Sequence, residues 1–313
     1  MPQISRRSFL QTATLTATAA WLAPRTMFAA DDPIAQMRAG GITAKITTQA
    51  LRRNVSVLMG SGGNIAVLAG PDGKLLVDSG FATSRPQIAQ ALAAISSAPL
   101  TTLVNTHWHF DHTDGNEWLH GAGATIVAHQ NTLTRLSTTQ QIAAFGATFP
   151  PSPAGALPTI TFHSSKSLSS NGESLALTHY EPAHTDTDIS VYFTEADILH
   201  CGDTWFHGVY PFIDYSTGGN INGMILAAQR NLATASAKTI LIPGHGPVGN
   251  RQDLAADLNM MTTIRDAVAA LKQQGKSADE AVAAKPTAAF DAKYGVGGIV
   301  PPDNFVRLVY QGV

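Results

Sequence analysis

The chain has 313 residues, of which 44% are hydrophobic and 13% charged, and its formal net charge is −2 at pH 7. This length is enough for one substantial α/β domain or two small ones. The near-neutral charge and the lack of a basic block argue against nucleic acid or an acidic membrane surface as a partner, and the single cysteine, Cys201, excludes an intrachain disulfide and a multi-cysteine zinc site.

The first thirty residues have the pattern of an export signal. Arg6 and Arg7 precede a mild apolar stretch over 12–23, and two alanines follow at 29–30. This order is typical of a twin-arginine signal cleaved near residue 30, although an ordinary Sec signal or a frayed amphipathic start remains open. We therefore expect the twin-arginine export machinery as a partner, a periplasmic or secreted mature chain, and no stable membrane anchor, because the stretch is too short and too polar to span a bilayer.

Short apolar segments separated by glycine or proline turns predict several strands in the first half of the mature chain. The expected strands cover 54–59, 64–68, 74–77, 103–104 and 125–128. Between the third and the fourth we expect a helix, which Thr83 or Ser84 would cap and which carries Pro86 in its first turn.

The second half begins with a proline-rich loop over 150–158 and predicts a further run of strands followed by helices. Strands are expected over 159–163, 174–180, 189–193, 197–201 and 239–242, and helices over 224–232 and 254–271. Ser277 with Glu280 forms a capping box, and the apolar tail 304–311 should pack back on the body. Strands and helices alternate without a linker, so we predict one catalytic α/β domain over 31–313 with a helical C-terminal extension.

The segment 106–112 contains the densest group of metal-binding residue types in the chain. His107 and His109 follow a predicted strand, and residues two apart in an extended segment face the same way, so both can bind one metal ion. Asp111 and His112 come where the chain should turn into a helix, and there they can face a second metal. Three histidines and an aspartate within six residues point to a metal site and not to a solvated loop.

The pattern His107-x-His109-x-Asp111-His112 resembles the signature of the metallo-β-lactamase-fold superfamily. Four further segments match that family in the right order, and the resemblance covers about residues 50 to 250. They are Val77-Asp78-Ser79-Gly80, Glu181-Pro182-Ala183-His184-Thr185, Leu199-His200-Cys201-Gly202-Asp203-Thr204-Trp205 and Pro243-Gly244-His245-Gly246-Pro247. The resemblance implies an α/β fold, the four-layer αβ/βα sandwich of that superfamily.

The resemblance also implies a site for two Zn²⁺ per chain, with a ligand set like that of glyoxalase II. The first zinc would bind His107, His109 and His184, the second Asp111, His112 and His245, and Asp203 would bridge both. Asp78 would orient a ligand histidine through its free ring nitrogen. Nitrogen and carboxylate donors without a thiolate suit zinc, and iron or manganese remains an alternative.

The activity implied by this resemblance is hydrolysis by a metal-bridging hydroxide. The substrate would be a small molecule with an ester, thioester, lactone or amide bond. Asp111 would be the catalytic side chain that orients the hydroxide or transfers a proton.

Two other activities remain open. Zinc β-lactamases of this superfamily mostly lack an aspartate in the bridging position, and some have a cysteine ligand there, whereas Asp203 occupies it here as in hydroxyacylglutathione hydrolases. We expect Cys201 to be a core residue. A β-lactamase is therefore the second hypothesis, and a mononuclear-iron sulfur dioxygenase, which shares part of the ligand set, is the third.

Aromatic residues follow Asp203 closely and can form either an apolar pocket wall or ordinary core. They are Trp205, Phe206, Tyr210, Phe212 and Tyr215, with Trp108 between the ligands. The remaining histidines have no motif partners, and we expect them to be structural or exposed. They are His120, His129, His163, His179, His200 and His207.

Overall fold

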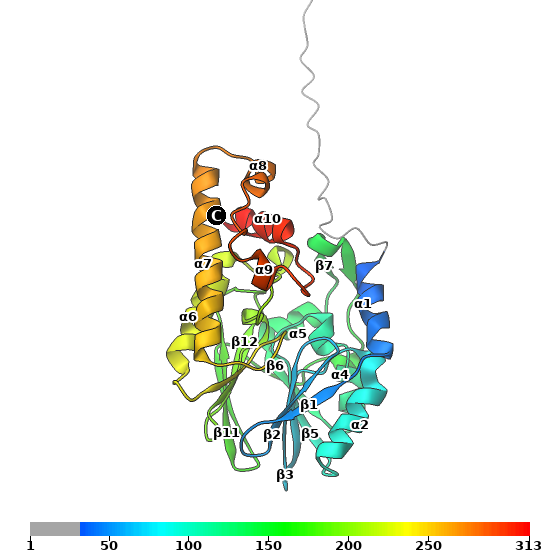
Figure 1. The fold of residues 1–313 in the computed structure, drawn as a ribbon. Coiled ribbons are helices and arrows are strands. Elements are labelled where there is room, and N and C mark those ends of the chain that lie inside the picture. Colours follow the sequence, from blue (N-terminus) through cyan, green and yellow to red (C-terminus); the bar gives the residue numbers. More distant parts are fainter. Residues whose placement is uncertain (1–31) are drawn as a thin grey trace, which may run out of the picture.

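The computed structural model describes residues 32–313. The predicted signal, residues 1–30, lies outside the described residues. Two β-sheets face each other, and helices cover the outer face of each, as Figure 1 shows. Within 32–313 no helix combines the length and the apolar character needed to cross a bilayer.

The first sheet has seven strands in the order β1-β2-β3-β4-β5-β6-β9. Strands β1 to β4 pair antiparallel, and β4, β5, β6 and β9 pair parallel. Their bounds are β1 Thr47–Ala50, β2 Val55–Met59, β3 Ile65–Gly70, β4 Gly73–Val77, β5 Leu100–Val104, β6 Thr125–His129 and β9 Ile160–Phe162. The carboxyl ends of β4 and β5 therefore meet at one edge of this sheet.

The second sheet has five strands in the order β10-β11-β12-β13-β14, of which only the last pair, β13 with β14, is parallel. A separate hairpin consists of β7 and β8. The bounds are β7 Gln140–Ile142, β8 Ala147–Phe149, β10 Ser165–Ser170, β11 Glu173–His179, β12 Ile189–Phe193, β13 Ile198–His200 and β14 Ile240–Ile242.

The helices lie on the outer faces of the sheets and along the C-terminal part of the chain (Figure 1). They are α1 Pro33–Ile42, α2 Arg85–Ile95, α3 Phe110–Thr113, α4 Asn116–Gly121, α5 Gln130–Leu136, α6 Ile221–Thr234, α7 Arg251–Gln273, α8 Ala278–Ala283, α9 Asp291–Tyr294 and α10 Pro302–Gly312. Single turns of 3₁₀ helix are η1 Ala82–Ser84, η2 Ala143–Phe145, η3 Ala154–Ala156, η4 Gly202–Thr204 and η5 Tyr215–Thr217.

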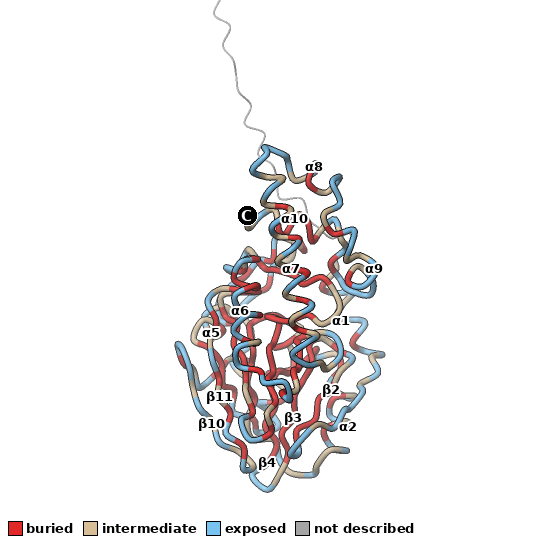
Figure 2. Tube along the Cα trace, turned by 60° about the vertical axis from the view of Figure 1, so that its left-hand side comes forward, coloured by how far each residue is buried: buried red, intermediate tan, exposed pale blue. Residues whose placement is uncertain are grey.

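Alternation along the central strands divides the interior into layers. In β4, Leu75 and Val77 point between the two sheets, whereas Leu76 points outward against the helix residues Ile88 and Leu92. Successive side chains of a strand face opposite sides, so a strand that is apolar at every position needs cover on both faces. Figure 2 shows the resulting concentration of buried residues on the strands. The predicted four-layer αβ/βα sandwich is confirmed.

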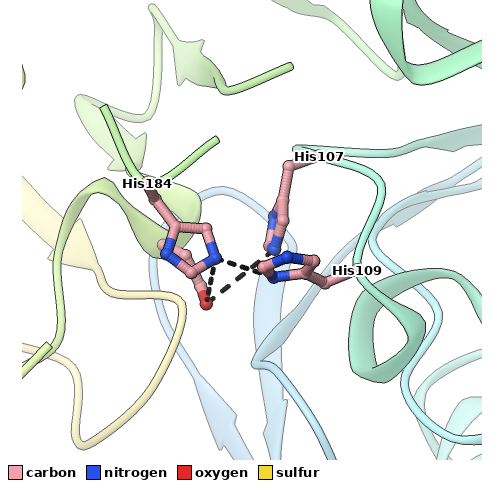
Figure 3. A group of neighbouring side chains, drawn as sticks. His107, His109 and His184 are labelled. Atoms are coloured by element: carbon pink, nitrogen blue, oxygen red, sulfur yellow. Dashed lines mark hydrogen bonds and ion pairs between the residues drawn. The ribbon is translucent and has the colours of Figure 1, made fainter. Parts of the chain in front are cut away.

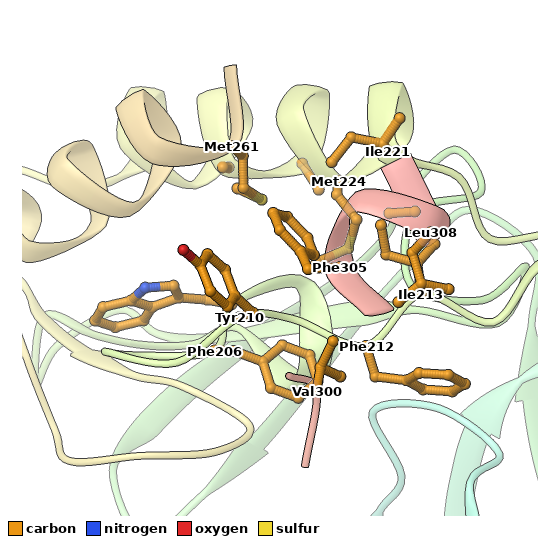
Figure 4. Packing of buried hydrophobic residues seen from close by; sticks show 14 of the residues in the cluster. Phe206, Tyr210, Phe212, Ile213, Ile221, Met224, Met261, Val300, Phe305 and Leu308 are labelled. Atoms are coloured by element: carbon orange, nitrogen blue, oxygen red, sulfur yellow. The ribbon is translucent and has the colours of Figure 1, made fainter. Parts of the chain in front are cut away.

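The C-terminal helices pack on the outer face of the second sheet. Phe305 of α10 is fully buried, and its ring stacks on Tyr210 at 4.7 Å between centroids. Figure 4 shows this contact beside Met224 of α6 and Met261 of α7. The indole N–H of Trp205 donates to a carboxylate oxygen of Asp257, a buried side chain of α7, at 2.8 Å. The predicted docking of the tail on the body is confirmed.

Most predicted strands and helices are confirmed within a few residues, including the capping box of Ser277 and Glu280 at α8. The prediction did not include α1, β1, α5, the β7–β8 hairpin, β10 or α9. At α2, Ser84 occupies the N-cap position, but its hydroxyl donates to the carbonyl of Gly41 and makes no capping bond. The expectation that Thr83 or Ser84 caps this helix was therefore wrong, because a tertiary contact with α1 takes that hydroxyl.

Candidate metal centre

Five chain segments meet at the edge of the sandwich where parallel strands end. β4 ends at Val77, directly before Asp78, and β5 ends three residues before His107. In the second sheet β13 and β14 lead into the segments with Asp203 and His245, and His184 lies on the connection between β11 and β12. This edge is where the fold brings residues that are far apart in the sequence together.

Four buried side chains form one group whose ligand atoms all lie within 4.8 Å of one another. The Nε2 atom of His184 is 2.8 Å from Nδ1 of His109 and 3.4 Å from Oδ2 of Asp203. The Nε2 atom of His107 is 3.8 Å from the same oxygen. Figure 3 shows that His184 approaches His107 and His109 from a different segment of the chain.

Asp111, His112 and His245 form the second group, within the same distance limit. Oδ2 of Asp111 is 3.1 Å from Nε2 of His245 and 3.6 Å from Nε2 of His112. Asp203 reaches both groups, because its Oδ1 is 3.1 Å from Nε2 of His112 and its Oδ2 is 3.4 Å from Nε2 of His245. The structure thus brings all seven predicted ligands together, with Asp203 between the two groups.

The donor set fits metal ions better than it fits a hydrogen-bond network. Nε2 of His107 is buried and has no hydrogen-bond partner. Two pairs of ring nitrogens face each other, His184 with His109 at 2.8 Å and His112 with His245 at 3.3 Å. A buried polar atom without a partner is costly, and a cation between these nitrogens would satisfy them together.

The electrostatics of the cluster favour deprotonated ligands at several positions. Burial lowers the pKa of His184 to about 4 and the pKa of His107 well below its ordinary value, so both rings are neutral at pH 7. Burial acts to raise the pKa of Asp111, but His112 and His245 outweigh it and hold this pKa at about 2. Neutral imidazole and ionised carboxylate are the forms that bind a metal. Burial acts to lower the pKa values of His112 and His245 as well, but the carboxylates of Asp203 and Asp111 outweigh it and raise both, that of His245 to about 9. These two rings must therefore release a proton when a metal binds.

Asp78 orients His112, a member of the second group, by a hydrogen bond to the ring nitrogen that does not face the other ligands. Its Oδ2 accepts from Nδ1 of His112 at 2.8 Å and from the hydroxyl of Thr106 at 2.7 Å, and its Oδ1 accepts from the Thr106 N–H at 2.7 Å. Its backbone has a φ of 67°, a strained value for a residue other than glycine. The geometry is the one expected from the sequence, in which Asp78 fixes a ligand histidine and leaves Nε2 toward the metal.

Two further carboxylates support the ligands, and the sequence analysis did not predict either of them. Oδ2 of Asp214 lies 3.0 Å from Nε2 of His109 and turns Nδ1 of that ring toward the first group. Asp188 accepts from the N–H groups of His184 and Thr185 at 2.7 and 2.9 Å, and burial raises its pKa to about 7. A signal was present for Asp214, which is a single carboxylate within the aromatic run Tyr210-Pro211-Phe212-Ile213-Asp214-Tyr215.

Two glycines leave room for the ligands. A Cβ atom on Gly63 would collide with the ring of His112, and one on Gly244 would collide with the carboxylate of Asp203. Gly63 also donates its N–H to the carbonyl of Asp111 at 3.0 Å. Both loops can therefore approach the ligands only without side chains.

The aromatic residues divide into two sets. Phe206 stacks on the ring of His245 at 5.2 Å, and Phe212 lies 5.9 Å from the ring of His184, so these two border the centre. Trp205 and Tyr210 are fully buried and belong to the core, and Tyr215 is partly buried against it.

The remaining histidines and the cysteine take the structural or exposed positions expected. None of them belongs to either ligand group among the described residues. Cys201 is fully buried, and burial raises the pKa of its thiol. His200 is buried with Nε2 at 3.2 Å from the carbonyl of Asn64, and the ring of the half-buried His207 bonds the carbonyl of Pro247 at 2.8 Å.

Comparison with known proteins agrees with this geometry. The model of the family described as the Metallo-beta-lactamase superfamily matches residues 58–255. A hydroxyacylglutathione hydrolase of Rhodospirillum rubrum is 26% identical over 165 residues, which are 51% of this chain and 55% of that protein. A probable metallo-hydrolase of Bacillus subtilis, YqgX, is 31% identical over 70 residues, which are 22% of this chain and 33% of that protein. The chain thus spans about half the length of the first of these relatives and a third of the second.

Solved structures share the fold. A metallo-beta-lactamase from Pontibacter korlensis aligns with a TM-score of 0.55 at 18% identity and covers 70% of this chain and 99% of that one. A stereoselective inverting sec-alkylsulfatase from Pseudomonas sp. aligns with a TM-score of 0.63 at 16% identity and covers 86% of this chain and 50% of that one. The alkylsulfatase alignment covers more of this chain than the metallo-beta-lactamase alignment does, so the likeness in fold to the alkylsulfatase extends over additional residues.

Proposed function

Because the chain belongs to the metallo-beta-lactamase superfamily, we propose that it is a hydrolase that binds two zinc ions and cleaves an ester, thioester, lactone or amide bond of a small molecule. The observation that carries this proposal is the convergence of seven ligand side chains in two groups that share Asp203. A purely structural cluster would not need an unpartnered ring nitrogen at its centre, as His107 has.

Bound zinc would supply a nucleophile from water near neutral pH and polarise the bond under attack. The side chains of Asp111 and His245 are 17% and 28% exposed, whereas those of the other five ligands are at most 4% exposed. Substrate therefore approaches from the side of Asp111 and His245, beside the ring of Phe206. There Asp111 orients the attacking water and carries its proton to the leaving group.

The names of the relatives support a hydrolase, and the bond type is our proposal. A β-lactamase remains the second candidate, since the fold neighbours include one so named, but Asp203 and not a thiolate lies between the two groups here. A mononuclear-iron sulfur dioxygenase is the third candidate. It needs only part of the ligand set, and Asp111, His112 and His245 would then be left without a metal.

The test is turnover of an ester, thioester, lactone and nitrocefin panel by the zinc-loaded protein and its variants. We expect His109→Ala and Asp111→Ala each to abolish turnover with an unchanged circular dichroism spectrum, because one removes a ligand and the other removes the proton carrier. His120→Ala is the matched control, because this exposed histidine belongs to neither ligand group and its ring bonds the carbonyl of Ala124. Turnover retained by either site variant would refute the mechanism.

We propose that the protein is exported through the twin-arginine pathway and acts in the periplasm or outside the cell. The support is the Arg6-Arg7 pair and the apolar stretch that follows it. Replacing both arginines by lysine should leave the protein in the cytoplasmic fraction of an expressing cell. Unchanged export of that variant would contradict this route and favour a Sec signal.

A further inference from the structure

A cavity of about 660 Å³ lies between α1 and the β7–β8 hairpin, which are neighbours in Figure 1. None of the seven metal ligands lines it. Its volume is in the range of pockets that enclose a small organic molecule. The proposed hydrolase mechanism makes no use of it.

Five buried apolar side chains form one part of the cavity wall. Trp108, Phe110, Leu136, Phe145 and Phe149 line the cavity, and each is less than one tenth exposed. Phe110 stacks on Phe149 at 5.4 Å, and the ring of Trp108 meets Phe149 edge-on at 5.7 Å. An aromatic wall of this kind suits a ligand with a flat ring or an aliphatic body.

Three charged residues that line the cavity, Arg38, Asp114 and Arg135, are already paired, and the carboxylate of the fourth, Asp32, accepts from the Ala35 N–H at 2.8 Å. Arg38 donates to both oxygens of Asp114 at 2.6 and 2.8 Å, and Arg135 donates to both oxygens of Asp186 at 3.1 and 2.6 Å. A ligand carboxylate or phosphate would have to displace one of these bidentate pairs. The cavity therefore favours a neutral ligand.

One wall of the cavity is connected to the metal centre by hydrogen bonds. The indole N–H of Trp108 donates to the hydroxyl of Thr217 at 3.1 Å, and that hydroxyl donates to Oδ2 of Asp214 at 2.6 Å. The same oxygen lies 3.0 Å from Nε2 of His109. A shift of the indole would thus alter the carboxylate that orients a ligand.

We propose that this cavity binds a neutral aromatic or aliphatic small molecule, and that its occupancy changes how tightly the centre holds metal through Trp108, Thr217 and Asp214. The coupling rests on the proposed function, whereas the binding does not. Reciprocity requires that metal in turn changes the affinity for the small molecule.

The binding is tested with 2-naphthol, a neutral aromatic probe, titrated into the full chain in a calorimeter. We expect one site per chain, and an affinity about tenfold or more weaker in Ala147→Phe, because a phenyl ring at this cavity-lining position fills the space. Ala143→Phe is the matched control on the same hairpin, since Ala143 is exposed and does not line the cavity. Ser152→Phe, at the other side of the cavity, serves if Ala147→Phe does not fold.

Absence of binding by the wild-type chain, or equal affinity in the wild type and both cavity variants, would overturn the site. The coupling is tested by the zinc affinity, measured in competition with a chelator of known affinity, with and without 2-naphthol. The wild-type zinc affinity should change by about fivefold or more, and the change should vanish in Thr217→Val, which still binds the probe. An unchanged wild-type affinity, or the same change in Thr217→Val, would refute the coupling and leave the binding result standing.

Discussion

At the scale of single residues, the ligands and the residues that hold them differ in how visible they are in a sequence. His107, His109, Asp111 and His112 lie within six positions, and this density singles them out. Asp214 lies 105 positions from the histidine that it orients. Nothing in a single sequence connects the two, because their contact depends on the path of the chain after β13.

Asp214→Asn should weaken zinc binding by about 10- to 100-fold, because the neutral amide no longer fixes the ring of His109 with its charge. The measurement is competition with a chelator of known affinity. Asp303→Asn, an exposed carboxylate in the first turn of α10, is the control and should bind zinc as the wild type does. Equal affinity in both variants would show that Asp214 does not support the centre.

At the scale of elements, the apolar pattern predicts buried elements and misses those that tertiary contacts stabilise. β10 has the sequence Ser-Lys-Ser-Leu-Ser-Ser, with one large apolar residue, and becomes a strand because it pairs with β11. α1 is attached by Arg38, which pairs with Asp114, and by the carbonyl of Gly41, which accepts from Ser84. The partners of α1 are distant in sequence, so local propensity could not reveal that helix. β10 differs, because the two-residue turn Asn171-Gly172 joins it directly to β11, and this local hairpin signal was missed.

The docking of α10 depends on Phe305, which is fully buried against Tyr210. Phe305→Ala should lower the free energy of unfolding by about 3–5 kcal/mol, the usual cost of removing a buried phenyl ring. Urea unfolding gives this value directly. Val296→Ala changes a side chain of a residue that is 71% exposed and should cost less than about 0.5 kcal/mol. Equal losses in the two variants would mean that α10 does not contribute to the core.

At the scale of the whole molecule, stability should fall in mild acid because His129 is buried in its neutral form. Burial is the main cause that lowers the pKa of His129 to about 4, and the charge of His179, whose ring stacks on it at 3.7 Å, lowers it further. The backbone hydrogen bond to His163 and the charge of Asp186 act in the opposite direction. The unfolded chain takes up a proton at an ordinary histidine pKa of about 6.5. The contribution of neutral His129 to the free energy of unfolding is therefore fully present above pH 6.5, and it is lost as the pH falls toward 4.

His129→Gln should make this decline shallower, because the amide can still donate to the carbonyl of His163 and does not titrate. The comparison is the free energy of unfolding at several pH values between 4 and 7 for both proteins. A wild-type decline no steeper than that of the variant would contradict the assignment to His129.

We have proposed that seven side chains from four segments hold two metal ions. The most direct test is the metal content of the purified full chain, measured by inductively coupled plasma mass spectrometry after loading with zinc and removal of excess. We expect two zinc ions per chain, one for each ligand group, and a loss of zinc in His109→Ala. A chain that retains no transition metal, or that binds a single iron and no zinc, would contradict it.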